Sequence, residues 1–298
     1  MDFEMIRTAK DPSFDVTTLP PLPPARTVLM VRPTYFDVEY VINPHMEGQI
    51  GTVDQSRAMD QWQAIHDTLI SLGLDVKVLD GVEGLPDMVF CANQSLPYIN
   101  QEGDPHALMS HMHSHHRADE VNHIAQWHES RGVATVDLPQ AGDFEGMGDA
   151  LWHPGRRLLW GGYGYRTDLS MYEAISTLVD APVAVLELVD PSFYHLDTCF
   201  CLLNESSVMI YPPAFTSQGL ELIESMFDHV FHIGEEDALE RFALNAFCPN
   251  GRDVLLQSGS SETISTLQSA GFVTHEHDTS EFIKSGGSVF CMKLQTWA

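Results

Sequence analysis

The sequence passes five times through the same cycle of apolar runs with strand character, a helical pattern and a closing strand. In the third cycle, strands are predicted at 150–152 and 158–160, a helix at 169–179 and a further strand at 183–186. One such unit cannot bury its own apolar face, so five of them predict a single repeat-built α/β domain. The pattern alone leaves open whether the units form one doubly wound sheet or close in a ring.

The other cycles have the same order, and an N-terminal arm at residues 1–26 precedes a single catalytic domain at 27–298. The arm ends in a proline-rich stretch that favours an extended chain. The remaining elements are expected as helices at 55–72, 118–131, 218–227 and 262–270, and as strands at 28–31, 76–78, 88–90, 107–109, 133–136, 198–203, 208–211, 230–232, 246–247, 254–256, 272–274 and 289–294.

Charge and cysteine usage narrow the class of protein. Acidic residues outnumber basic ones by 42 to 15, and the net charge of −27 disfavours nucleic acid and anionic membranes as partners. It favours the approach of a small cation, although acidity also serves solubility or a salt-rich setting. No apolar run reaches the ~20 residues of a membrane helix, and residues 1–26 carry no apolar signal core. Five scattered cysteines without a zinc-binding spacing therefore predict a reduced, cytoplasmic protein.

Four stretches are richer in polar residues than ordinary strand ends. They are residues 84–93, 143–149, 193–197 and 285–293. Each lies at the start or the end of a cycle, so the repeat is expected to bring all four to one pole of the molecule. Polar side chains on rigid strand ends are typical of a functional site.

The thiol and the imidazole of these stretches have ordinary structural interpretations when taken singly. Cys291 lies in a predicted apolar strand, where most cysteines are buried structural thiols. The preceding Ser285-Gly-Gly favours a functional role, because glycines let a ligand approach the backbone. His195 and Asp197 are two positions apart and face the same way if the segment is extended.

The acidic side chains complete the set. Glu145 lies in a glycine-flanked turn and Asp87 follows a proline, so each alone reads as a loop residue. Together with Asp197, they supply three carboxylates that can hold a delocalised cation through bidentate hydrogen bonds. A thiol beside such a cation is placed to attack its central carbon.

These stretches resemble the pentein superfamily of guanidino-group-modifying enzymes, which includes arginine deiminases, dimethylarginine hydrolases and amidinotransferases. The similarity is greatest to the arginine dihydrolases. It implies a five-bladed α/β propeller with pseudo-fivefold ββαβ repeats, and no metal or organic cofactor. The motifs that carry it are Arg32-Pro, Phe36 to Pro44, Pro86 to Asn93, Phe144-Glu-Gly, Gly162 to Arg166, Phe193 to Cys201, Ser280 to Gly287 and Cys291.

The resemblance implies a role for each matching residue. Cys291 matches the nucleophile that forms a covalent thiouronium, and His195 matches the general acid and base. Glu145 and Asp197 match carboxylates that orient the guanidinium or the histidine. The positions implied to bind substrate are Asn43, Asp87, Asn93, His111 and Arg166, the last as a partner of the substrate carboxylate.

Two positions bear on the substrate. Asn93 stands where deiminases and dimethylarginine hydrolases carry an acid and where arginine dihydrolases carry asparagine, so the resemblance implies hydrolysis of arginine to ornithine. His111 stands where the dihydrolases carry an arginine that binds the substrate α-carboxylate. We therefore expect either a shifted preference within the arginine-like class or a replacement charge from Arg166 or Arg117.

Other readings stay open at this point. His111, His113 and His115 could share a strand face and bind zinc or nickel, although a polar loop explains them more simply. A citrulline-forming hydrolase and an amidinotransferase use the same covalent step. A non-enzymatic propeller-type binding protein, as in ribosome anti-association factors, is disfavoured by His195 and Cys291. A homo-oligomer is possible.

Overall fold

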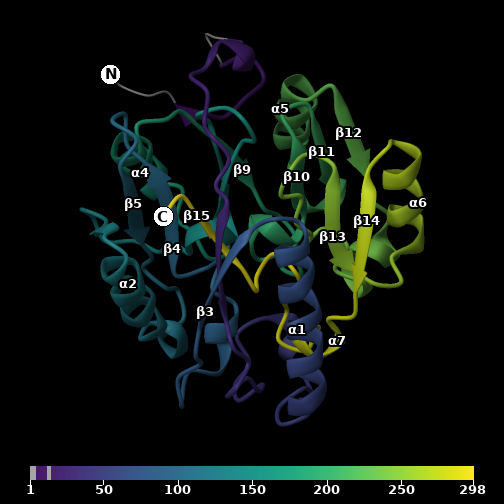
Figure 1. Cartoon of the computed structure of the whole chain (residues 1–298). Helices are drawn as coiled ribbons and strands as arrows, with labels where there is room; N and C mark the ends of the chain where they lie inside the picture. Colours follow the sequence, from purple (N-terminus) through teal and green to yellow (C-terminus); the bar gives the residue numbers. More distant parts are fainter. Residues whose placement is uncertain (1–4, 12–14) are drawn as a thin grey trace.

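Five small sheets, each with its own helix, make up the fold (Figure 1). The computed structural model describes residues 5–11 and 15–298. The sheets have the strand orders β15-β2-β3, β4-β5-β6, β1-β9-β8-β7, β10-β11-β12 and β13-β14. The strands are β1 (Met5–Ile6), β2 (Thr27–Val31), β3 (Asp75–Leu79), β4 (Ser95–Ile99), β5 (Pro105–Met109), β6 (Ala134–Val136), β7 (Ala150–Trp152), β8 (Leu159–Tyr163), β9 (Val183–Glu187), β10 (Phe200–Asn204), β11 (Ser207–Ile210), β12 (His229–His232), β13 (Asp253–Gln257), β14 (Val273–His277) and β15 (Leu294–Thr296).

The helices that cover these sheets agree with the predicted helical patterns to within a few residues. In α1, Ala58, Trp62, Ile65 and Leu69 are buried at the three- and four-residue spacing of one helix face. The Asp54 carboxylate accepts the backbone N–H of Arg57 and so caps this helix. The α-helices are α1 (Gln55–Ser71), α2 (Glu120–Ser130), α3 (Gly146–Asp149), α4 (Met171–Val179), α5 (Ser217–Met226), α6 (Ser261–Ser269) and α7 (Ser280–Ile283).

Each unit has the same internal pairing. β10 and β11 are antiparallel, and β11 and β12 are parallel because α5 crosses between them. The sheets β4-β5-β6 and β7-β8-β9 repeat this arrangement. In the fifth unit, the bridge between Phe247 and Leu255 stands in place of a full antiparallel strand. The expected ββαβ repeat of a five-bladed α/β propeller is therefore confirmed.

The C-terminal strand β15 completes the first unit. β15 pairs antiparallel with β2, with Leu294 opposite Leu29. In the arm, Met5 pairs with Val183 and Pro21 bridges Arg156. Residues 1–4 and 12–14 of the predicted arm lie outside the described residues, and the division at residue 26 stays a prediction. Within the described part of the chain, no helix has the length and apolar character to cross a membrane.

Two predicted strands near the site are wrong, and the condition of an extended segment at His195 is not met. Met88 lies in a 3-10 helix, Pro86–Val89, because Pro86 favours a helix start and cannot donate to a sheet. Leu196–Thr198 is also a 3-10 helix, and His195 is its N-cap, so the segment around His195 is not extended. Cys291 lies in a turn ahead of β15, and its backbone N–H binds a side chain instead of a neighbouring strand.

The pairing of β15 with β2 gives a first prediction. Leu294 is fully buried between the first unit and the core, so Leu294→Ala is expected to lower the free energy of unfolding by about 2–5 kcal/mol. Urea denaturation measures this. Ile70→Ala on the exposed side of α1 is the control and is expected to change stability little. Equal effects of the two substitutions would contradict the role given to β15.

Candidate active site

One site residue comes from the start of the first strand in each unit. Asn93 lies just before β4, Asp149 ends α3 before β7, and Asp197 lies before β10. Asn245 precedes the bridge at Phe247, and Cys291 precedes β15. Contacts between side chains of these residues show that strand starts far apart in the sequence meet at one pole, as the four polar stretches predicted.

Cys291 lies between an acceptor and a donor. Its Sγ is 3.2 Å from Asp197 Oδ2, to which the thiol donates. Asn245 Nδ2 donates to the same sulfur at 3.2 Å, and Asn245 Oδ1 accepts the backbone N–H groups of Cys291 and Ser288. Burial and the neighbouring Asp197 carboxylate raise the pKa of the thiol well above its usual value. In the free protein Cys291 is therefore a neutral thiol near pH 7.

Asp197 is itself perturbed by its surroundings. Burial raises the pKa of its carboxyl to about 7, against the opposing hydrogen bond from Cys291 and the positive charge of Lys293. Among the described residues, no group donates to Asp197 Oδ1. This carboxylate therefore has one oxygen available to a ligand.

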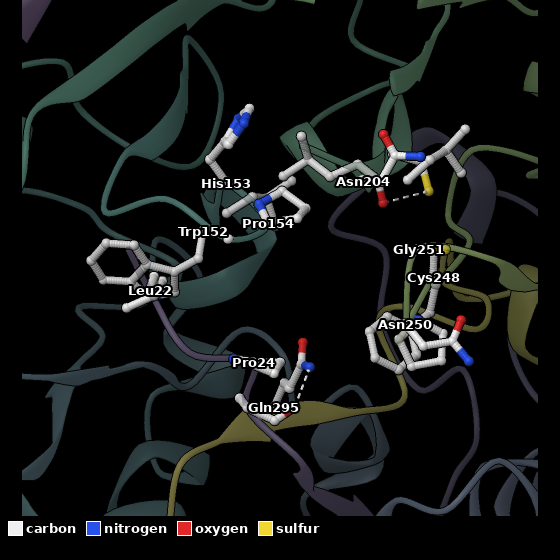
Figure 2. Close-up of a pocket in the computed structure, with 18 of the residues that line it drawn as sticks. Leu22, Pro24, Trp152, His153, Pro154, Asn204, Cys248, Asn250, Gly251 and Gln295 are labelled. Atoms are coloured by element: carbon white, nitrogen blue, oxygen red, sulfur yellow. Dashed lines mark hydrogen bonds between the residues drawn. The ribbon is translucent and has the colours of Figure 1, made fainter. Parts of the chain in front are cut away.

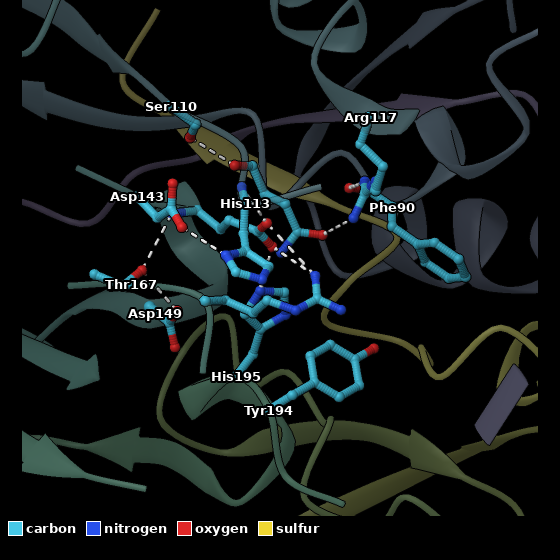
Figure 3. A network of polar contacts seen from close by, with 12 residues as sticks. Phe90, Ser110, His113, Arg117, Asp143, Asp149, Thr167, Tyr194 and His195 are labelled. Carbon is cyan, nitrogen blue, oxygen red and sulfur yellow. Dashed lines mark hydrogen bonds and ion pairs between the residues drawn. The ribbon is translucent and has the colours of Figure 1, made fainter. Parts of the chain in front are cut away.

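Glu145 joins the imidazole to a guanidinium (Figure 3). His195 Nε2 lies 2.6 Å from Glu145 Oε2, and Arg166 Nη1 lies 3.2 Å from the same oxygen. Burial opposes ionisation of Glu145, but the hydrogen bond and charge of His195, with the charges of Arg166 and Arg117, lower its pKa to about 2. The ionised carboxylate fixes the orientation of the His195 ring.

A small pocket opens onto Cys291 and has a volume of about 10 Å³. Of the predicted site residues, the structure places the side chains of His195, Glu145 and Asp197 behind or beside it and not in its lining. The lining residues are Ile42, Asn43, Met46, Asp87, Phe90, Asn93, Arg117, Arg166, Tyr194, Ser285, Gly286, Gly287 and Cys291.

Asp87 is held at the pocket wall by the glycine-rich turn. Ser285 Oγ donates to Asp87 Oδ1 at 2.7 Å, and Asn43 Nδ2 donates to the Ser285 carbonyl at 3.0 Å. Within the described part of the chain, Asp87 Oδ2 has no donor. At Gly286, with φ of 84°, a Cβ would lie 2.7 Å from Tyr194 Oη. Glycine is thus required at this position, because a side chain would clash with Tyr194 and because the positive φ is unfavourable for other residues.

Arg117 also lines the pocket. The sequence suggests it only as one of two residues that could replace the charge missing at His111. It is buried, pairs with Glu120 at 2.8 Å, and donates to Asn93 Oδ1 at 2.9 Å. Further bonds to the carbonyls of Asp87 and Phe90 fix its orientation. The three-residue spacing of Arg117 and Glu120 is a visible signal for this pair, whereas the contact with Asn93 is not visible in the sequence.

Comparison with known proteins identifies the family. The family model described as N,N dimethylarginine dimethylhydrolase, eukaryotic, matches residues 42–297. The chain belongs to this family. It is 37% identical over 273 residues to the N(G),N(G)-dimethylarginine dimethylaminohydrolase of Mycobacterium tuberculosis, covering 92% of this chain and 86% of that protein.

Family members with a second activity are equally similar. Over 271 residues the chain is 37% identical to the bifunctional arginine dihydrolase/ornithine cyclodeaminase ArgZ of Synechocystis sp.. The match covers 90% of this chain but 37% of that protein's length. A crystal structure of a mutant N-terminal domain of ArgZ bound to substrate has a TM-score of 0.85 and 36% identity, and covers 91% of this chain and 99% of that domain.

Among the predicted substrate-binding residues of this protein, His111 is the one that does not line the small pocket. Its Nδ1 lies 3.2 Å from the Gly142 carbonyl, and its backbone bridges Phe144. The other histidines of the cluster are also engaged locally. His113 contacts the Asp143 carboxylate at 2.5 Å, and His116 stacks on Tyr40 with ring centroids 4.2 Å apart. The described residues contain no group of three or more ligands arranged for a metal ion.

A larger pocket of about 410 Å³ is lined by residues from several of the strands that begin at the site (Figure 2). Trp152, at the end of β7, and Asn204, at the end of β10, line it. Gln295 of β15 and Leu22 of the arm complete the wall shown in the figure. The thiol Cys291 and the carboxylates around it are absent from its lining. The chemistry therefore belongs to the smaller pocket.

The contact between Cys291 and Asp197 predicts a change in thiol reactivity. Only the thiolate is alkylated, and the Asp197 carboxylate disfavours it. Asp197→Asn removes this charge and is expected to lower the thiol pKa. Iodoacetamide labelling of Cys291, followed by peptide mass from pH 6 to 10, should then start at lower pH. The exposed Asp228→Asn is the control, and an unchanged profile in Asp197→Asn would contradict the assigned contact.

Proposed function

We propose that the protein is a cysteine hydrolase acting on the guanidino group of arginine or a close analogue. The observation that carries this proposal is a pair of carboxylate oxygens beside the Cys291 thiol, Asp87 Oδ2 and Asp197 Oδ1, which receive no hydrogen bond from any described residue. Buried carboxylate oxygens without donors are costly, and a planar cation with several N–H groups satisfies them. The activities named for the dimethylarginine and arginine relatives fit this chemistry. Lining side chains must move to admit a ligand of that size.

In the first step, the bound cation favours the Cys291 thiolate, because it offsets the charge of Asp197. The sulfur adds to the guanidinium carbon, and the bond from that carbon to one nitrogen then breaks. Protonated His195 gives its proton to the departing nitrogen, which leaves as ammonia. A thiouronium on Cys291 remains.

In the second step, His195 acts as a base. Neutral His195 takes a proton from water, and the resulting hydroxide adds to the thiouronium carbon, so the carbon–sulfur bond breaks. Glu145 keeps the ring in place in both steps and compensates its positive charge. A second round on the ureido product releases another ammonia and leaves a carbamate on the ornithine nitrogen, and this carbamate breaks down to ornithine and carbon dioxide. Arginine and two waters thus become ornithine, two ammonia molecules and carbon dioxide.

Asn93 supports an ornithine product over a citrulline product. Its Oδ1 is held by Arg117, and its Nδ2 has no acceptor within the described residues. The amide therefore presents a donor that suits the carbonyl oxygen of a ureido intermediate, whereas an acid would repel that oxygen. The alternative is a dimethylarginine hydrolase or deiminase that stops at citrulline, and the family model favours it. An amidinotransferase is the other enzymatic alternative.

The cellular setting is inferred from the thiols. All five cysteines are free, which fits a reducing compartment and supports a cytoplasmic location. The proposed steps use only side chains and water, and the partner they require is a small cationic substrate. A homo-oligomer stays a prediction.

Product analysis tests the proposed activity. Incubation with arginine is expected to yield ornithine and two equivalents of ammonia, measured by mass spectrometry and an ammonia assay. Cys291→Ser should abolish turnover, whereas Cys248→Ser, at a partly exposed thiol outside the site, should not. Citrulline as the sole product would overturn the ornithine assignment. Activity only on dimethylarginine, or transfer of the amidine to an amine, would replace the proposed reaction with one of the alternatives.

The carboxylate-binding residue is tested by comparing arginine with agmatine, which lacks the carboxylate. Arg166 lines the pocket and binds Glu145 and the Ile42 carbonyl through one N–H group each. If it also binds the substrate carboxylate, Arg166→Lys lowers kcat/KM for arginine about 10- to 100-fold more than for agmatine. His111→Ala should leave this ratio unchanged, since His111 lies outside the pocket lining. If His111→Ala changed this ratio and Arg166→Lys did not, His111 would be the residue that binds the substrate carboxylate.

A further inference from the structure

Lys293 is a buried lysine that the proposed reaction does not use. It lies two residues after Cys291, directly ahead of β15, and its side chain is fully buried. Among the described residues, its Nζ has no hydrogen-bond partner. A lysine in this environment is costly unless it has a compensating charge or a function.

Aromatic rings enclose the ammonium on one side. Nζ lies 3.3 Å from the centroid of the Phe290 ring and 4.3 Å from that of Phe247. Both rings line the larger pocket of Figure 2, whereas Lys293 does not, so they separate the ammonium from that pocket. The ring faces are negative and partly stabilise a cation.

Two of the acidic groups near Lys293 belong to the candidate active site. Asp197 is the carboxylate whose charge acts on the lysine most strongly, and the thiol of Cys291 acts on it as well. Asp197 also accepts a hydrogen bond from the Cys291 thiol. Lys293 does not line the small pocket, so we expect it to act on a ligand there only through these neighbours.

We propose that Lys293 is a positioning residue of the reaction, whose buried positive charge keeps Asp197 ionised and thereby ready to bind the substrate cation and the thiol. The inference rests on the proposed function of this site. Without the lysine, only hydrogen bonds such as that from Cys291 oppose the effect of burial on Asp197, which then binds protons at higher pH and attracts a guanidinium less strongly. Asp197 and Lys293 titrate as a coupled pair, so the loss appears in a pH profile of activity.

Lys293→Met tests the role, because methionine keeps an unbranched side chain and removes the charge. The acid limb of kcat/KM against pH is expected to move upward by about one unit, with at least a ~10-fold loss near pH 6. Lys293→Arg retains the charge and should keep the limb in place. Lys77→Met removes an exposed lysine of β3 and is the control. An unchanged acid limb in Lys293→Met would overturn the proposal.

Stability gives a second readout that needs no substrate. Burial lowers the pKa of Lys293 to about 7, below its value in the unfolded chain. Between these two pKa values the unfolded chain binds the extra proton, so the wild type gains stability as pH rises from 7 to 10. Lys293→Met lacks this gain. It should be more stable than the wild type at pH 7, and its advantage should shrink towards pH 10.

The two readouts separate the possible failures. An unchanged acid limb in Lys293→Met overturns the proposal whatever the stability difference is, because a lysine that stays protonated up to pH 10 would still act on Asp197. Absence of turnover by the wild type on any guanidino compound would instead overturn the proposed function. If Lys293→Met does not fold, Lys293→Gln provides the same neutral comparison by urea denaturation and pH profile.

Discussion

The buried carboxylate of Glu145 is the group around which the site is arranged. It is fully buried and therefore needs positive partners, which are His195 and Arg166. Its Oε1 also accepts the backbone N–H of His113, and its own backbone N–H binds Thr167 Oγ1. Because these partners come from different units, satisfying one charge fixes the relative positions of several strand starts.

The sequence predicts those features of the fold that depend on local patterns of residues. Strands such as β2 and helices such as α1 follow from apolar runs and helical spacing, and the repeat indicates that their polar ends converge. The missed features depend on distant contacts. The turn at Cys291 is held by Asn245, and the position of Arg117 is fixed by Asn93. No local pattern contains such information.

The placement of the basic residues shows the same limit. Correspondence by motif placed His111 at a substrate-binding position where the dihydrolases carry an arginine, and the structure places its imidazole against the Gly142 carbonyl. Arg166, which was expected to bind the substrate carboxylate, lines the pocket together with Arg117. Arg117 comes from the segment between β5 and α2, and Arg166 from the turn after β8. A charge required at one pole of a repeat fold can be supplied from any unit, so position in the sequence is a weak guide to which residue supplies it.

The free site stores unfavourable energy that a cationic ligand relieves. Asp87 Oδ2 and Asp197 Oδ1 lack donors, the thiol of Cys291 is held neutral, and Lys293 Nζ lacks an acceptor, within the described residues. Each of these groups would be better solvated in the unfolded chain, so the site lowers stability. In the proposed reaction, a guanidinium supplies the missing donors and offsets the negative charge beside the sulfur. Binding energy would thereby be coupled to thiolate formation, so that the proposed nucleophile reacts only when its target is in place.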